Sequence, residues 1–225
     1  MLLKYDTSLV KVTNNLLKLE DKTPSFPYTL NISNFNTDTL SDGKIVFNSN
    51  SIISKKEGNS AIKIYFPNNN VSKYFNLNLY ELFNIDFSKT FIIEYDILLP
   101  QTHINYAGLR SQNIGNVACL TRTPYCSPQG VYFYKSAATN IINNKGSTLN
   151  YSDSACNRYI VSFTSPTNIK IKINPLNNHC QYLINNALYF EFTINFLNYI
   201  FTINNGANEA KNCTVELYSL KLYYE

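Results

Sequence analysis

The 225-residue sequence has no tryptophan, one methionine, two histidines and only seven glycines. Two histidines without a paired spacing do not make a metal centre of the usual kind. The G-x-S-x-G nucleophile motif, the phosphate-binding loop and the dinucleotide-binding glycine pattern are also missing. These absences argue against an enzyme, and we expect neither a metal nor an organic cofactor.

Charged side chains are few and scattered. They make up 15% of the residues, and 19 Lys and Arg against 15 Asp and Glu give a formal net charge of +4. Because no run of five or six like charges occurs, we expect neither a nucleic-acid partner nor membrane insertion. The longest apolar stretches have only the length of a strand, so no transmembrane segment is expected. No signal peptide is expected either, because Asp6 and Lys11 interrupt any apolar core near the start.

The five cysteines form no C-x-x-C pair and are too dispersed for a zinc module. Their odd number leaves at least one thiol free. Cys119 and Cys126 flank the segment LTRTPY and have a spacing that would let them bridge a loop. We favour separate reduced thiols, because the protein is expected to assemble inside a cell.

Asparagine, tyrosine and phenylalanine are abundant, with 34, 18 and 14 copies. From Ile45 onward, apolar and polar residues alternate in short segments, as in half-buried strands. The segments include KIVFN, AIKIYF, FIIEYDILLP, NVACL, GVYFYK, RYIVSF, NIKIKIN, QYLI, LYFEFTI, NYIFTI and CTVELYSLKLYY. About ten strands with hardly any helical pattern predict an all-β, antiparallel two-sheet sandwich. Only NLYELFN has the spacing of a short helix.

Asparagine pairs are expected to supply the turns that glycine usually makes, because asparagine tolerates positive φ better than other side chains. The pairs lie between the strand segments at Asn14-Asn15, Asn143-Asn144, Asn177-Asn178, Asn185-Asn186 and Asn204-Asn205. We therefore interpret them as turn residues rather than as ligand-binding residues.

Residues 1–24 form a separate N-terminal segment. Two similar arms, LVKV and LLKL, surround Thr13-Asn14-Asn15, which is the pattern of a β-hairpin. An isolated two-stranded hairpin is marginally stable in water. It is therefore expected either to cover the sandwich or to anchor the protein to a partner, and residues 25–225 are assigned to the sandwich.

The segments NYIFTINNG and CTVELYSLKLYYE resemble the closing strands of the concanavalin A-like lectin and laminin-G sandwiches, and FIIEYDILLP is similar to a central strand of that superfamily. The resemblance extends over about residues 40–225 as a pattern of strands. It implies a jelly-roll sandwich of the kind that often binds glycans.

An enzyme hypothesis can be tested at Glu94 and Asp96. Their spacing is similar to the Glu-x-Asp-x-x-Glu strand of the jelly-roll glucanases, in which the last carboxylate is the acid/base. Leu99 occupies that third position here, and leucine cannot transfer a proton. The chain also lacks tryptophan, the usual sugar-stacking residue of such clefts. We therefore expect Glu94 and Asp96 to be polar residues on the outer face of a strand.

A binding hypothesis uses the residues between Gln101 and Tyr159. Sugar recognition combines polar side chains with an aromatic ring under the sugar. Alternation in GVYFYK directs Tyr132 and Tyr134 to one face, which we predict they share with Glu94 and Asp96. The candidate ligand-binding residues are Arg110, Tyr132, Tyr134, Tyr151, Asp153, Glu94 and Asp96.

The LVKV and LLKL arms resemble the openings of small bacteriophage tail and fibre proteins, where a short attachment segment precedes a lectin-like domain. This resemblance implies a non-enzymatic virion protein, a fibre or decoration protein located in the virion. It would self-associate, as a trimer if it is a fibre, attach to other virion proteins through residues 1–24, and have a cell-surface glycan as its candidate ligand. The alternatives are a carbohydrate-active enzyme and a cellular lectin-like adhesion module.

Overall fold

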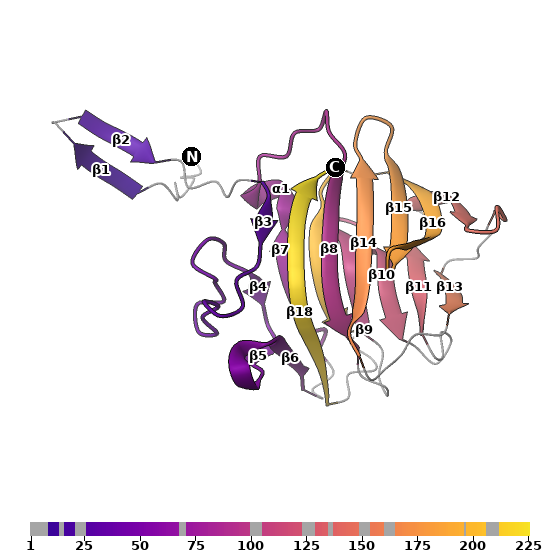
Figure 1. The fold of residues 1–225 in the computed structure, drawn as a ribbon, viewed down its shortest axis with the longest axis horizontal. Helices are drawn as coiled ribbons and strands as arrows, with labels where there is room; N and C mark the ends of the chain where they lie inside the picture. Colours follow the sequence, from indigo (N-terminus) through magenta and orange to yellow (C-terminus); the bar gives the residue numbers. More distant parts are fainter. Residues whose placement is uncertain are drawn as a thin grey trace.

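Two antiparallel β-sheets, packed face to face, make up most of the computed structural model (Figure 1). The structure describes residues 9–13, 16–20, 26–67, 71–99, 105–122, 129–134, 137–148, 154–159, 165–195, 197–205 and 212–225. The predicted all-β two-sheet sandwich is confirmed.

The larger sheet has nine strands. In spatial order they are β12 (Ala138–Asn143), β16 (Ala187–Ile194), β15 (His179–Ile184), β14 (Thr167–Asn174), β8 (Phe91–Leu98), β18 (Cys213–Tyr224), β6 (Ile62–Phe66) and β5 (Ile52–Lys55), with β3 (Tyr28–Thr29) also paired to β18. Strand β8 lies beside both β14 and β18, so the centre of the sheet combines the middle and the end of the chain.

The smaller sheet has seven strands. Their order is β13 (Ser154–Tyr159), β11 (Gln129–Tyr134), β10 (Gly115–Arg122), β9 (Asn105–Ser111), β17 (Ile200–Asn205), β7 (Tyr74–Asn78) and β4 (Asn48–Ser49). The described helices are a short α1 (Leu79–Leu82), which follows β7 directly where NLYELFN predicts a helix, and the 3₁₀ turn η1 (Glu57–Asn59).

The core lies between the two sheets and is built by period-two alternation. Ile169, Ile171 and Ile173 of β14 are buried, whereas Lys170 and Lys172 between them are only partly covered. The same alternation runs along β8, β6, β7 and β15. Strands with one apolar face predict this arrangement, and the structure confirms it.

Aromatic rings join the two sheets. The ring of Phe133 in β11 lies 5.2 Å from those of Phe190 and Phe192 in the opposite sheet. Elsewhere, the Tyr95 hydroxyl of β8 donates a hydrogen bond of 2.8 Å to the Ala107 carbonyl of β9. The phenylalanines and tyrosines therefore fill the volume that tryptophan and methionine would otherwise occupy.

Asparagine makes several of the tight turns, as expected. Asn185 and Asn186 have φ of 50° and 64° in the turn between β15 and β16, and Asn178 has φ of 57°. The prediction was wrong for Asn204 and Asn205, which belong to strand β17 and are buried. The Asn204 amide donates to the Asn116 Oδ1, and the Asn205 Oδ1 accepts the backbone N–H of Lys73.

The N-terminal hairpin is present as a two-stranded sheet of β1 (Leu9–Thr13) and β2 (Leu16–Glu20). No described strand of the two larger sheets pairs with it, and Figure 1 draws it apart from them. Within the described residues, no helix combines the length and the hydropathy that crossing a lipid bilayer requires.

Cys119 and Cys180 are buried free thiols, and Cys213 is buried as well. Burial raises the pKa of the Cys119 thiol to about 12, so this thiol is protonated and unreactive at neutral pH. Cys126, its candidate disulfide partner, lies outside the described residues.

Candidate functional site

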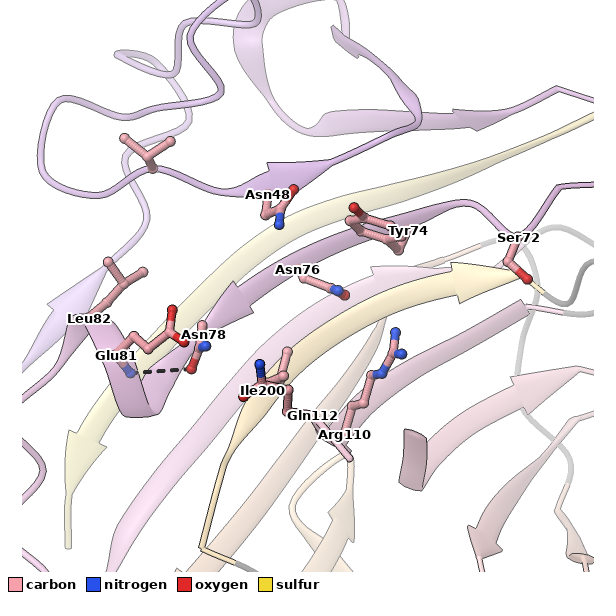
Figure 2. A pocket seen from close by; sticks show the side chains of 11 residues that line it. Asn48, Ser72, Tyr74, Asn76, Asn78, Glu81, Leu82, Arg110, Gln112 and Ile200 are labelled. Atoms are coloured by element: carbon pink, nitrogen blue, oxygen red, sulfur yellow. Dashed lines mark hydrogen bonds between the residues drawn. The ribbon is translucent and has the colours of Figure 1, made fainter. Parts of the chain in front are cut away.

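The outer face of the seven-stranded sheet contains a hollow of about 590 Å³ (Figure 2). Its floor comes from β7, β17 and β9. Val46 and Asn48 and the α1 residues Glu81 and Leu82 also border it. The lining residues are Val46, Asn48, Ser72, Tyr74, Asn76, Asn78, Glu81, Leu82, Arg110, Gln112 and Ile200.

The polar lining follows from the register of the sheet. Asn48, Asn76, Thr202 and Gly108 are opposite one another on consecutive strands β4, β7, β17 and β9. Residues opposite each other in neighbouring strands share a face, and Asn48 and Asn76 of this row line the hollow. Gly108 allows a close approach to β10, since a Cβ there would lie 2.6 Å from the Ala118 carbonyl oxygen and 3.1 Å from the Tyr95 hydroxyl.

A chain of hydrogen bonds runs beneath this floor. The Asn204 amide donates to the Thr202 Oγ1 over 2.9 Å, and the Thr202 hydroxyl donates to the Asn76 Oδ1 over 2.6 Å. At its other end, Asn204 exchanges two hydrogen bonds with Asn116, of 2.7 and 3.2 Å. The floor amides are therefore held in fixed orientations.

Arg110 contributes a cationic side chain to the hollow. It projects from β9, is half-buried, and extends toward the end lined by Ser72 and Tyr74 (Figure 2). Its Nε is buried without a hydrogen-bond partner, and Arg110 takes part in none of the ion pairs seen among the described residues. A half-buried guanidinium without a protein anion is available to a ligand.

A second hollow of about 220 Å³ adjoins the first and shares Ser72, Tyr74 and Arg110 with it. Tyr106 lines this second hollow, and its ring lies edge-on to that of Tyr132 with 5.2 Å between the centroids. Burial raises the pKa of the Tyr132 hydroxyl. We call these two adjoining hollows the seven-strand groove.

The predicted site residues fall into two separate groups. Arg110, Tyr132 and Tyr134 lie on the outer side of the seven-stranded sheet, where Tyr132 is half-buried and Tyr134 exposed. Tyr151 and Asp153 lie outside the described residues.

The prediction that Glu94 and Asp96 share a face with Tyr132 and Tyr134 was wrong. Glu94 and Asp96 belong to β8 of the nine-stranded sheet, so they point to the opposite side of the sandwich. Alternation tells which residues of one strand point outward, but it does not tell in which sheet that strand lies.

The carboxylates of Glu94 and Asp96 are engaged with neighbouring strands. Asn168 donates to Asp96 over 2.8 Å and to Glu94 over 3.3 Å, and the Tyr223 hydroxyl donates to Glu94. Partial burial alone would raise the Glu94 pKa, but the bonds from Tyr223 and Asn168 and the charges of nearby lysines lower it overall. A lowered pKa does not suit a general acid. Leu99, at the third position of the glucanase pattern, is buried.

Sequence reasoning missed the residues of β7. Tyr74, Asn76 and Asn78 alternate with the buried Phe75 and Leu77. The segment YFNLN carries this alternation in the sequence, and the alternation is the signal that identifies its outward polar residues.

Neither a family model nor a curated protein matches the sequence. Solved structures do match. The carbohydrate recognition domain of Emp46p, in its metal-free form, aligns with a TM-score of 0.55 and 16% identity over 90% of this chain and 97% of that one. The fold is a concanavalin A-like jelly-roll sandwich. Alginate lyase AlgAT5 of polysaccharide lyase family 7 aligns with a TM-score of 0.51 and 10% identity, over 77% of this chain and 82% of its own.

A sialidase also aligns, with a TM-score of 0.52 and 8% identity over 78% of this chain. The match covers 16% of the sialidase chain. At these identities, the likeness establishes the fold and leaves the function to be argued from the groove.

Proposed function

We propose that the chain binds a glycan in the seven-strand groove and does not cleave it. The observation that carries the proposal is the hollow of about 590 Å³ whose floor presents oriented amides and an arginine. Side-chain amides and guanidinium groups are the usual partners of sugar hydroxyls, and tyrosine rings stack on sugars. The likeness to a domain described as a carbohydrate recognition domain supports this proposal.

The absence of turnover is part of the same proposal. Glycoside hydrolysis needs two carboxylates on opposite sides of the bond. Glu81 is the one carboxylate among the described lining residues of the large hollow. Glu94 and Asp96 are on the other side of the sandwich. The described groove thus supports binding better than hydrolysis.

Replacing Asn76 with alanine is expected to weaken glycan binding about threefold to tenfold, because one amide partner of a sugar hydroxyl is lost. A glycan array identifies a ligand, and calorimetric titration measures its affinity for each variant. Asn168→Ala is the matched control, since it removes an asparagine from the outer face of the opposite sheet.

Unchanged affinity in Asn76→Ala together with weakened binding in Asn168→Ala would move the site to the opposite sheet. Release of reducing ends from any polysaccharide by the purified chain would contradict the non-enzymatic part of the proposal.

A virion role, as a fibre or decoration protein attached through residues 1–24, stays a prediction from the sequence. Deletion of residues 1–24 is expected to shift the melting temperature by less than about 2 °C, because β1 and β2 form their own sheet. Scanning calorimetry measures this shift, and sedimentation shows whether self-association is lost with the segment. A fall of more than about 4 °C would indicate that the hairpin completes the sandwich core.

A further inference from the structure

The hydrogen bonds beneath the large hollow fix which end of the Asn76 amide is free. The Asn204 NH₂ donates to the Thr202 Oγ1, and the Thr202 hydroxyl donates its own proton to the Asn76 Oδ1. The carbonyl end of Asn76 is therefore used within the protein. Its NH₂ donates to no other described residue, and Asn76 lines the hollow.

Two further side-chain amides, those of Asn78 and Gln112, also use their oxygen within the protein and leave their NH₂ group free. The Asn78 Oδ1 accepts the backbone N–H of Glu81 over 3.2 Å, and a backbone N–H can only donate, so the NH₂ end of Asn78 is the free one (Figure 2). The Gln112 Oε1 accepts a long bond of 3.5 Å from the Asn198 amide. All three residues line the hollow, and each leaves its donor end available.

Arg110 adds a charge to these donors. Its guanidinium has five N–H groups and no acceptor, and its buried Nε has no partner within the described chain. Glu81, which carries the opposite charge, lies at the α1 end of the hollow, and Figure 2 shows the guanidinium directed toward the other end. The part of the hollow around Arg110 is therefore positive and rich in donors.

From this polarity we propose that the glycan bound in the groove carries a carboxylate, and that the guanidinium of Arg110 binds it. A neutral sugar offers hydroxyls that both donate and accept, whereas a carboxylate only accepts, which matches the free donor ends of Asn76, Gln112 and Arg110. The planar guanidinium can pair with both oxygens of a carboxylate at once. The inference rests on the proposed function, since it names the class of sugar for the same groove.

The test compares acidic sugars with their own methyl esters, which differ only in the charge. The full chain is titrated with tetragalacturonate, tetramannuronate and 3′-sialyllactose, with the methyl ester of each, and with a sulfated dextran oligosaccharide. We expect at least one acid to bind about tenfold more tightly than its ester, with a preference that falls as salt is added.

Arg110→Gln is expected to lower the affinity for the acid much more than the affinity for the ester, so that the preference for the acid is lost. Arg110→Lys keeps the charge but loses the paired contact, so an intermediate affinity is expected. Lys63→Gln is the matched control, because it removes one positive charge from the outer face of the nine-stranded sheet and should change nothing.

The outcomes separate this inference from the proposed function. Equal binding of acid and ester, an equal loss for both in Arg110→Gln, or binding of the sulfated probe alone would overturn the carboxylate inference. Binding of neutral glycans alone would overturn it while leaving the proposed function intact. A chain that binds no glycan of any class would overturn both.

Discussion

Replacement of Asp42 with alanine is expected to lower the free energy of unfolding by about 4 kcal/mol. Asp42 is 4% exposed and accepts the Tyr28 hydroxyl over 2.8 Å, together with the backbone N–H groups of Asn31, Lys44 and Ile45. Removing the carboxylate leaves four donors without their charged acceptor, and buried donors without partners are costly. Urea denaturation followed by circular dichroism measures the change.

Two variants show whether the buried carboxylate itself is responsible. Asp38→Ala removes an exposed carboxylate from the same loop and is expected to change stability by less than about 0.5 kcal/mol. Tyr28→Phe removes one of the four donors and is expected to cost about 1.5 kcal/mol. If Asp42→Ala were no more harmful than Asp38→Ala, this account of the loop would be wrong.

Tyr28 also makes the stability of the protein depend on pH at the alkaline end. Burial, with the hydrogen bond and the charge of Asp42, raises the Tyr28 pKa far above its ordinary value. Because the Tyr28 pKa is higher in the folded than in the unfolded state, protonated Tyr28 contributes its full share of the free energy of unfolding below the unfolded pKa of about 10. This contribution decreases as the pH rises above that value. Because the same loop carries Val46 and Asn48, which line the large hollow, glycan binding should decrease in Asp42→Ala as well.

The sandwich was predictable because strand patterns are local. Ile169, Ile171 and Ile173 alternate with lysines, and any sheet that buries one face of this segment must bury those isoleucines. The turns at Asn178 and Asn185 were predictable for the same reason, since a positive φ is a property of a single residue. Asn204 and Asn205 look the same in the sequence, but partners far along the chain, Asn116 and Lys73, hold them within a strand.

The candidate site was predictable only in part, because it depends on which strands become neighbours. Tyr132 points outward as GVYFYK predicts, yet the alternation contains nothing that separates its sheet from that of Glu94. Likewise, Asn76 and Arg110 are 34 positions apart and meet only because β17, from the end of the chain, lies between β7 and β9. Such long-range pairing cannot be read from the spacing of residues in one sequence.

Substitutions at two adjacent residues of β11 test whether the inner and outer faces of this strand contribute differently to stability. Phe133→Ala is expected to lower the free energy of unfolding by about 4 kcal/mol, because it opens a cavity between the sheets and removes ring contacts with Phe190 and Phe192. Tyr134→Ala, on the outer face, is expected to change stability by less than about 0.5 kcal/mol.

Chemical denaturation of both variants beside the unchanged chain measures the difference. If the two substitutions were equally harmful, Tyr134 would be covered by another part of the protein or by a second copy, as a self-associating chain predicts, and dilution should then restore the difference. If both were harmless, Phe133 would not join the two sheets. A large effect of Phe133→Ala alone would leave the Tyr134 ring free on the outer face beside the seven-strand groove, where a bound glycan can reach it.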